Sequence, residues 1–242
     1  MIQIIGLKKY FHTKNVLFGK TGNIIKAVDD VSFSVPRGTT FGLVGESGSG
    51  KTTIARLIVG ILKADEGDVS LGGAADIVFQ DPFSSLNPRM RVGDIVGESL
   101  RVKGVPSREI KERVQVALKE VSLKNPESAM CYPHQFSGGE RQRIAIARAI
   151  ICRPAIIILD EPVSSLDVSI QASILNLLKD IQQKLNLTYL FISHDLRVVE
   201  FMSDTVGVMK KGRLVEVASR NEIYLAPKSA YTRHLLDSIP RI

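Results

Sequence analysis

Short apolar runs and one amphipathic stripe alternate in the first part of the chain. Four runs have the length and apolar content of β-strands, at residues 2–7, 31–35, 40–44 and 77–79. Between the last two runs, apolar side chains recur at helical spacing. They are Ile54, Leu57, Ile58, Ile61 and Leu62. The order of strand, helix and strand predicts a βαβ unit.

The pattern changes between residues 82 and 153, where the strand-like runs stop. An amphipathic helix is predicted to begin near Ser107, directly after Pro106, because the apolar positions that follow have helical spacing. These positions are Ile110, Val114, Ala117, Leu118 and Val121. This part of the chain is therefore predicted to be a helical insert.

Strand character returns at residues 156–159, a continuous apolar run typical of a parallel strand that is covered on both faces. The helix that follows has an apolar stripe of Ile170, Ile174, Leu177, Leu178, Ile181 and Leu185. The next strand is predicted at residues 189–192, and a hairpin is predicted to turn at residues 211–212. Beyond it, Ser219 and Glu222 have the spacing of a capping box, which predicts short helices.

The composition fits a water-soluble globular protein. Of the 242 residues, 44% are hydrophobic and 24% are charged, and no apolar run approaches the length of a membrane span. The N-terminus lacks the pattern of a secretory signal and the two cysteines are too few for a disulfide framework, so we expect a cytoplasmic location. The net charge of +7 fits nucleic acid, anionic lipid or a phosphate ligand. Because the charges are scattered, this balance alone does not identify a partner.

The strongest chemical signal is a phosphate-binding loop of the pattern G-x-x-x-x-G-K-[ST]. Its residues are Gly45, Glu46, Ser47, Gly48, Ser49, Gly50, Lys51 and Thr52, with Thr53 after them. The glycines let backbone N–H groups turn toward phosphates, Lys51 is expected to reach the β- and γ-phosphates, and Thr52 offers a hydroxyl to Mg²⁺. A glycine-rich turn that only caps a helix is the alternative. The predicted strand before the loop and the helix after it favour nucleotide binding.

Two acidic residues, Asp160 and Glu161, end the apolar run at residues 156–159. The carboxyl end of a buried strand is where α/β sheets place ligands. Asp160 is the expected metal-side carboxylate, and Glu161 is expected to orient or deprotonate the attacking water. An acidic helix start before Pro162 is the alternative, but the phosphate loop in the same chain favours hydrolysis.

Two consecutive glycines, Gly138 and Gly139, stand in a predicted first helical turn. The flanking Ser137 and Glu140 have the spacing of a capping box, which explains the serine and the glutamate. It does not explain the glycines, which are costly in a helix unless another group must approach the backbone closely. An anion at this helix N-terminus is one such group.

These motifs together resemble the ATP-binding subunits of ABC transporters. Residues 137–140 and the Arg-Gln-Arg after them are similar to the family signature, although Glu140 stands where the family usually has Gln. Gln80 matches the Q-loop, residues 165–167 match the D-loop, and His194 matches the switch histidine. The motifs occur in the order of the family and cover nearly the whole chain.

The resemblance implies roles for individual residues. Glu161 and His194 would be catalytic, and Gln80 would join Thr52 and Asp160 at the metal ion. Besides the phosphate loop, the nucleotide would contact Gln80, Ser137, Gly138, Gly139, Glu140, Asp167 and Phe11. Phe11 stands where the family stacks an aromatic ring on adenine, and core packing is the alternative for this side chain.

Finer similarity points to the importers of oligopeptides, dipeptides and nickel. The segments that carry it are residues 82–89, 132–135, 230–233 and 239–240. One departure is residues 68–76, a stretch shorter than most members carry, so we expect a trimmed antiparallel β portion. The iron–sulfur cysteine cluster that some members have near the C-terminus is not in this sequence.

The implied fold is α/β, a P-loop NTPase of the ABC ATPase type with a mixed β core, a small antiparallel β portion and an inserted helical subdomain. Residues 1–242 would form a single ABC ATPase domain. Residues 1–81 and 155–242 would form the RecA-like nucleotide-binding core, and residues 82–154 the helical subdomain that carries the signature. Two such subunits, identical or paralogous, are expected to pair head to tail, so that ATP lies between the phosphate loop of one and the signature of the other.

The implied function is a Mg²⁺-dependent ATPase that powers import of peptides or a related small solute, such as nickel, through two separate membrane permease subunits. A solute-binding protein would act indirectly, and the chain would be a peripheral subunit at the cytoplasmic face of the cell membrane. Residues 81–101 are expected to dock on the permeases, because they connect Gln80 to the helical insert.

Two other functions remain as alternatives. A soluble ABC-type ATPase that acts on DNA, chromosomes or ribosomes would suit the basic net charge. Its known types resemble this chain only across a coiled-coil interruption or in paired cassettes, so the single unbroken cassette argues against it and no nucleic acid is expected. A nucleotide-binding module without turnover is disfavoured by the presence of both Glu161 and His194.

Overall fold

The computed structural model divides into two compact units. The first unit comprises residues 1–72 and 188–242, and the second comprises residues 73–187. The residues described by the structure are 1–12, 24–80 and 85–238. Within these ranges, no helix has both the length and the apolar character of a membrane span.

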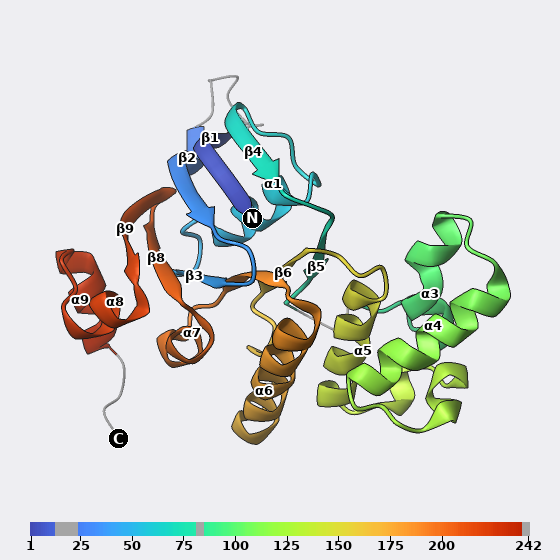
Figure 1. The fold of residues 1–242 in the computed structure, drawn as a ribbon. Helices are drawn as coiled ribbons and strands as arrows, with labels where there is room; N and C mark the ends of the chain where they lie inside the picture. The colour runs from blue at the N-terminus through green and yellow to red at the C-terminus, as the bar shows by residue number, and fades with distance from the viewer. Residues whose placement is uncertain (13–23, 81–84, 239–242) are drawn as a thin grey trace, which may run out of the picture. The chain divides into compact units, whose positions relative to one another are not determined.

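The first unit contains a three-stranded antiparallel sheet (Figure 1). Its strands are β1 (Ile2–His12), β2 (Ile24–Val35) and β4 (Glu66–Leu71). β1 lies in the middle, and its first residue, Ile2, pairs with Val35 on one side and with Leu71 on the other. β1 and β2 are both longer than the apolar runs at residues 2–7 and 31–35 predict, because pairing between the two strands continues beyond those runs.

Four further strands of the first unit form a mixed sheet in the order β7, β3, β8, β9. They are β7 (Thr188–Ile192), β3 (Thr40–Val44), β8 (Thr205–Lys210) and β9 (Arg213–Ser219). β3 runs parallel to β7 and β8, whereas β9 returns antiparallel to β8. The predicted hairpin is confirmed, with φ values of 46° at Lys211 and 84° at Gly212. Two positive φ values are typical of the tight turn that joins twisted strands.

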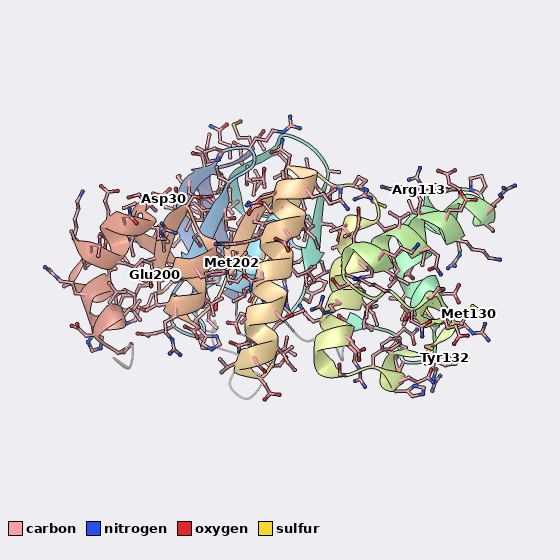
Figure 2. The ribbon with its side chains drawn as sticks, turned by 60° about the horizontal axis from the view of Figure 1, so that its bottom comes forward. Asp30, Arg113, Met130, Tyr132, Glu200 and Met202 are labelled. Carbon is pink, nitrogen blue, oxygen red and sulfur yellow. The ribbon has the colours of Figure 1, made fainter. Side chains whose placement is uncertain are left out.

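The described part of the first unit contains four helices, and α8 and α9 lie beside β9 (Figure 1). They are α1 (Lys51–Ile58), α7 (Leu196–Met202), α8 (Arg220–Leu225) and α9 (Ala230–Asp237). α7 buries Met202 and leaves Glu200 in solvent (Figure 2). The predicted capping box at the start of α8 is confirmed, since Ser219 and Glu222 bond reciprocally.

The helix predicted from residue 54 to residue 62 ends earlier than the spacing of its apolar residues suggests. Gly60 follows α1 with φ of 77°, a left-handed conformation that glycine adopts readily and that ends helices. Ile61 therefore lies outside the helix, and 57% of its surface is exposed.

In its described residues, the second unit combines two parallel strands with four helices. β5 (Ala75–Val78) pairs with β6 (Ile156–Asp160), and Val78 lies opposite Leu159. The helices are α3 (Val92–Val102), α4 (Ser107–Glu120), α5 (Gly138–Ile150) and α6 (Val168–Leu185), with short 3₁₀ turns η1 (Pro126–Met130) and η2 (Pro133–Gln135). α3, α4 and α5 contact one another (Figure 1). The helix predicted from Ser107 is confirmed.

Two predictions concern the borders of these parts. β4 ends at Leu71 and β5 begins at Ala75. The short stretch at residues 68–76 therefore comprises the end of β4, a three-residue link and the start of β5. By their contacts, β5, β6 and α6 belong to the second unit, together with α3, α4 and α5. The division into a core and a helical subdomain of residues 82–154 stays a prediction.

Candidate nucleotide-binding site

The phosphate loop of the first unit connects β3 to α1 and has a backbone that only glycine fits. Gly45 and Gly50 have φ values of 153° and 108°. A Cβ on Gly45 would lie 2.2 Å from the carbonyl oxygen of Met209, and a Cβ on Gly50 would lie 2.0 Å from that of Ala27. The loop is therefore packed directly against backbone, and its open side can present N–H groups to phosphates.

Lys51 is the first residue of α1 and lies across this loop. Its Nζ donates to the carbonyl oxygens of Gly45 at 2.7 Å and Glu46 at 3.0 Å, and to Ser49 Oγ at 3.4 Å. Only 5% of the residue is exposed. The ammonium group is thus held against the loop by three oxygen acceptors.

The first turn of α1 has the features of an anion site. It contains Thr52 and Thr53, both partly exposed, and no acidic side chain. The positive end of the helix dipole and the first N–H groups therefore face the loop without a competing carboxylate. Among the described residues, no cluster of three or more His, Cys, Asp or Glu side chains is arranged to hold a metal.

Phe11 lies near the end of β1, where it pairs with Ile25 of β2. Its side chain is at the surface, since 38% of the residue is exposed, and the Nζ of Lys9 lies 5.8 Å from the ring centroid. The alternative that Phe11 packs in the core is therefore wrong. An exposed aromatic face is what stacking on a base requires.

The second unit brings Gln80 and Glu161 together. β5 and β6 are parallel neighbours, so the residues after them leave the sheet at the same edge. Gln80 Nε2 donates to Glu161 Oε2 over 2.9 Å. Asp160, the last residue of β6, is 3% exposed, and Glu161 has a φ of 50°. A positive φ at a glutamate costs energy and is found preferentially at functional sites.

The loop after Glu161 is fixed by a residue that the sequence reasoning missed. Gln171 Nε2, from α6, donates to the carbonyl oxygens of Val163 at 3.0 Å and Leu166 at 2.9 Å. The only sign of this role in the sequence is that Gln171 stands directly after Ile170, the first residue of the apolar stripe predicted for this helix. Asp167 is the N-cap residue of α6, but its side chain makes no capping bond. The carboxylate of this D-loop residue is exposed.

His194 follows β7 in the first unit and is exposed. The alternative role for it was to cap the next helix. Asp195 takes that role instead, since its side chain accepts a hydrogen bond from the backbone N–H of Arg197 at 2.9 Å. His194 is therefore positioned at the end of a strand without serving as the helix cap.

The signature residues of the second unit form the predicted capping box. Glu140 Oε2 accepts from Ser137 Oγ at 2.7 Å and from Ser137 N at 2.9 Å, and Ser137 is the N-cap of α5. The hydrogen bonds from the Ser137 side chain and backbone hold the pKa of Glu140 below its usual value. The carboxylate that replaces the usual Gln is thus engaged within its own turn.

The two signature glycines differ in their surroundings. A Cβ on Gly139 would lie 2.6 Å from Cγ2 of Ile170, whereas a Cβ on Gly138 would meet Leu166 Cδ2 at an ordinary 3.4 Å. The side chain of Ile170 on α6 is thus one group that already requires glycine at position 139. Among the described residues, no such contact requires glycine at position 138. The approach of an anion to either glycine stays a prediction.

The predicted site residues are thus distributed over both units. The phosphate loop, Phe11 and His194 belong to the first unit, whereas Gln80, the two carboxylates, Asp167 and the signature belong to the second.

Comparisons with known proteins identify the family of the chain. The ABC transporter family profile matches residues 28–164. A putative peptide import ATP-binding protein of Brucella ovis is 45% identical over 257 residues, which cover 99% of this chain and 78% of that protein. The oligopeptide transport ATP-binding protein AppF of Bacillus subtilis is 45% identical over 258 residues, with the same coverage of 99% and 78%.

Solved structures give the same result for the fold. A dimeric ATP-binding cassette in a post-hydrolysis state, bound to ADP and Pi, has a TM-score of 0.79 and 26% identity over 91% of this chain and 99% of that one. CbiO1 of Clostridium perfringens, part of the ABC transporter complex cbiONQ, has a TM-score of 0.79 and 26% identity over 99% of this chain and 96% of that one. The predicted P-loop α/β fold is confirmed, and the chain belongs to the ABC transporter family as one of its ATP-binding cassettes.

Proposed function

We propose that this chain is the Mg²⁺-dependent ATPase subunit of an importer for peptides or a related small solute. The observation that carries the hydrolytic part is the 2.9 Å contact between Gln80 and Glu161. It joins a residue suited to a metal or γ-phosphate to the carboxylate suited to water activation. Relatives named as peptide and oligopeptide import proteins, which match nearly the whole chain, support the transported class.

In this proposal each half of the site has a distinct task. Lys51 would bind the β- and γ-phosphates, while Thr52, Gln80 and Asp160 would hold a Mg²⁺ ion, which would neutralise charge on the phosphates. Glu161 orients the attacking water or takes its proton. His194 contacts the γ-phosphate from the end of β7.

A second cassette would complete the site. Two observations support a head-to-tail dimer in which residues 137–140 and Asp167 of one subunit face the ATP of the other. Among the described residues, none packs closely enough on Gly138 to require a glycine there, and a structurally similar cassette is dimeric with ADP and Pi bound.

The membrane partners are proposed to contact the segment at residues 81–101. Residues 81–84 lie outside the described part, and Leu86 is 1% exposed, so its side chain is not available for this contact. The proposed contact surface comprises Asn87 and Arg89, both exposed, together with a nearby cavity of about 520 Å³ between α3, α4 and η1. Residues lining it include Arg91, Asp94, Arg101, Lys111 and Met130, and Met130 is 60% exposed (Figure 2).

Phosphate release from ATP tests the enzymatic part of the proposal. The purified chain should hydrolyse ATP with Mg²⁺, and EDTA or Lys51→Ala should abolish turnover while the far-UV circular dichroism stays unchanged. Arg56→Ala, at an exposed position of the same helix, is the matched control and should keep wild-type turnover. Equal rates in Lys51→Ala and Arg56→Ala would contradict the proposal.

Cysteine cross-linking tests the transport part. Asn87→Cys, made in a variant without the two native cysteines, should cross-link to a co-expressed permease in a yield that changes with ATP. Glu127→Cys, at an exposed position on η1, tests how far the contact extends. If neither cysteine cross-links, and the chain instead binds duplex DNA or ribosomes with salt-sensitive affinity, the soluble-ATPase alternative replaces the importer.

A further inference from the structure

A buried carboxylate, Asp29 of β2, lies between the strand that carries Phe11 and the turn that supports the phosphate loop. Its side chain is 8% exposed. Oδ1 accepts from the phenol of Tyr10 at 2.6 Å, and Oδ2 accepts from Nε of Arg213 at 2.8 Å. Lys26 Nζ lies 3.7 Å from Oδ2. Asp29 therefore connects β1 and β9, whose residues Tyr10 and Arg213 lie far apart in the sequence.

A bulge in β2 directs Asp29 into this position. Lys9 pairs with Val28 and Leu7 pairs with Val31, so Asp29 and the next residue, Asp30, face a single residue of β1. Asp30, labelled in Figure 2, has a φ of 61°. Bulges re-aim side chains and occur preferentially near active sites. The positive φ of Asp30 therefore lies within the bulge that turns Asp29 toward Arg213.

Gly212, the residue before Arg213, connects Asp29 to the phosphate loop. Asp29 N donates to the carbonyl oxygen of Gly212 at 2.8 Å, and Gly212 N donates to the carbonyl oxygen of Ser49 at 2.9 Å. Gly212 also packs on β2, since a Cβ there would lie 2.4 Å from the carbonyl oxygen of Lys26. One residue of the β8–β9 turn therefore links Asp29 to the loop through two backbone hydrogen bonds.

Tyr10, the other partner of Asp29, stands next to Phe11, the side chain proposed to bind the base. Tyr10 precedes Phe11 on β1, and its N–H donates to Asp65 Oδ2 at 2.6 Å. Asp65 also pairs with Lys9 at 2.7 Å. Because neighbouring side chains of a strand point to opposite faces, fixing Tyr10 by its phenol and its N–H also fixes the direction in which Phe11 points.

We propose that Asp29 is a positioning residue that sets the distance between the base-binding Phe11 and the phosphate loop. This inference rests on the proposed ATP-binding role of Phe11. A nucleotide touches both places at once, so its affinity depends on their spacing, whereas a ligand without a base touches only the loop. Asp29 contacts neither ligand and acts through Tyr10 and Arg213.

Binding of ADP and of inorganic pyrophosphate to the full chain, measured by isothermal titration calorimetry, separates this role from a general structural one. Asp29→Asn should weaken ADP binding about five- to tenfold and change pyrophosphate binding less than twofold. Tyr10→Phe, which removes one hydroxyl group, should act in the same direction. Phe11→Ala should weaken ADP binding in the wild-type background and add little in the Asp29→Asn background.

Two matched controls remove equivalent groups elsewhere in the first unit. Glu66→Gln breaks the 2.6 Å ion pair with Lys8 on the same sheet, and Tyr224→Phe removes a phenol that donates to the carbonyl oxygen of Leu196. Both should leave the ratio of the ADP and pyrophosphate affinities unchanged. Thermal melting of every variant reports whether it is folded.

The outcomes separate this inference from the proposed function. If Asp29→Asn lowers both affinities by the same factor, or neither, Asp29 does not set the spacing and the inference is overturned, while Phe11→Ala still reports on base stacking. If Phe11→Ala leaves ADP binding unchanged, stacking on Phe11 is overturned together with the inference. A wild-type chain that binds neither ligand would overturn the proposed nucleotide site itself.

Discussion

At the scale of single residues, Gly138 and Gly139 show how adjacent identical residues can serve different purposes. Gly139 is buried under Ile170 of α6, whereas Gly138 is partly exposed and has room for a Cβ. Packing within the chain therefore explains Gly139, whereas Gly138 fits the proposed approach of a second subunit.

This difference predicts that alanine destabilises the protein at position 139 but not at position 138. Gly139→Ala should lower the free energy of unfolding by roughly 1–3 kcal/mol, because its methyl group would overlap Ile170. Gly138→Ala should leave stability nearly unchanged. Thermal or denaturant unfolding of both variants checks this, and equal losses would show that the packing of α5 on α6 is described wrongly. In the Ile170→Ala background, which lacks the overlapping Cγ2, Gly139→Ala should cost less stability than in the wild-type background.

Residue roles were predictable only where the chemistry is encoded locally. The phosphate loop, the capping boxes at Ser137 and Ser219, and the Asp-Glu pair at the end of β6 are predictable from short motifs. Asp29 is not, because its partner is fixed by the fold: Arg213 lies 184 positions from Asp29 in the sequence. No local pattern distinguishes such a carboxylate from an ordinary surface charge.

At the scale of elements, three segments of the second unit meet at Glu120, the last residue of α4. Its side chain is 9% exposed and pairs with Arg153, which follows α5, at 2.9 Å and with Lys184 of α6 at 3.0 Å. Burial raises the pKa of Glu120, but hydrogen bonds from Arg153 and Lys184 outweigh burial and hold the pKa below its ordinary value. The folded state thus favours the charged form.

A depressed carboxyl pKa predicts a definite dependence of stability on pH. Glu120→Gln should lower the free energy of unfolding at pH 7 by about 1–2 kcal/mol, a modest loss because Arg153 and Lys184 are half exposed. The difference from wild type should shrink as the pH falls below the ordinary value of 4.5, where the carboxylate becomes protonated. Denaturant unfolding from pH 7 to pH 3 measures it.

The control for this experiment lies on the same helix. Glu112 pairs with Arg108, but both side chains are largely exposed, so Glu112→Gln should change stability little at any pH. A Glu120→Gln variant with the stability of Glu112→Gln throughout this pH range would contradict the role assigned to Glu120.

Element types were predicted better than their limits. The strand at residues 40–44 and the helix from Ser107 agree with the structure because their patterns are regular and their ends carry local signals. α1 stops at Ile58 because Gly60 adopts a left-handed conformation, although the apolar spacing continues to residue 62. β1 and β2 extend beyond their apolar runs because pairing between strands, which a one-dimensional pattern does not contain, sets their length.

At the scale of the whole molecule, the residues proposed for ATP are divided between two units of the chain and a second subunit. This division predicts a substitution that separates binding from turnover. Gly138→Asp would place a carboxylate where the phosphates of the partner's ATP are expected, and like charges repel. Binding of ATP to the monomer should keep its wild-type affinity while turnover falls at least tenfold.

Gly138→Ala serves as the control, because it adds a side chain without charge at the same place. It should retain more turnover than Gly138→Asp. Equilibrium dialysis with ATP, beside a phosphate-release assay, provides both quantities. If the Gly138→Asp monomer loses ATP affinity as steeply as it loses turnover, the signature acts on the nucleotide of its own chain and the head-to-tail arrangement is wrong.

The central claim is that Glu161 activates water in a site closed by a second cassette, and Glu161→Gln tests it most directly. The glutamine keeps the size of the side chain and an oxygen that can accept from Gln80, but it lacks the charge needed to take a proton. Size-exclusion chromatography with light scattering should show a stable dimer of this variant with Mg²⁺ and ATP, a monomer with ADP, and turnover at least a hundredfold below wild type. A variant that remains monomeric with ATP and hydrolyses it at the wild-type rate would contradict the account.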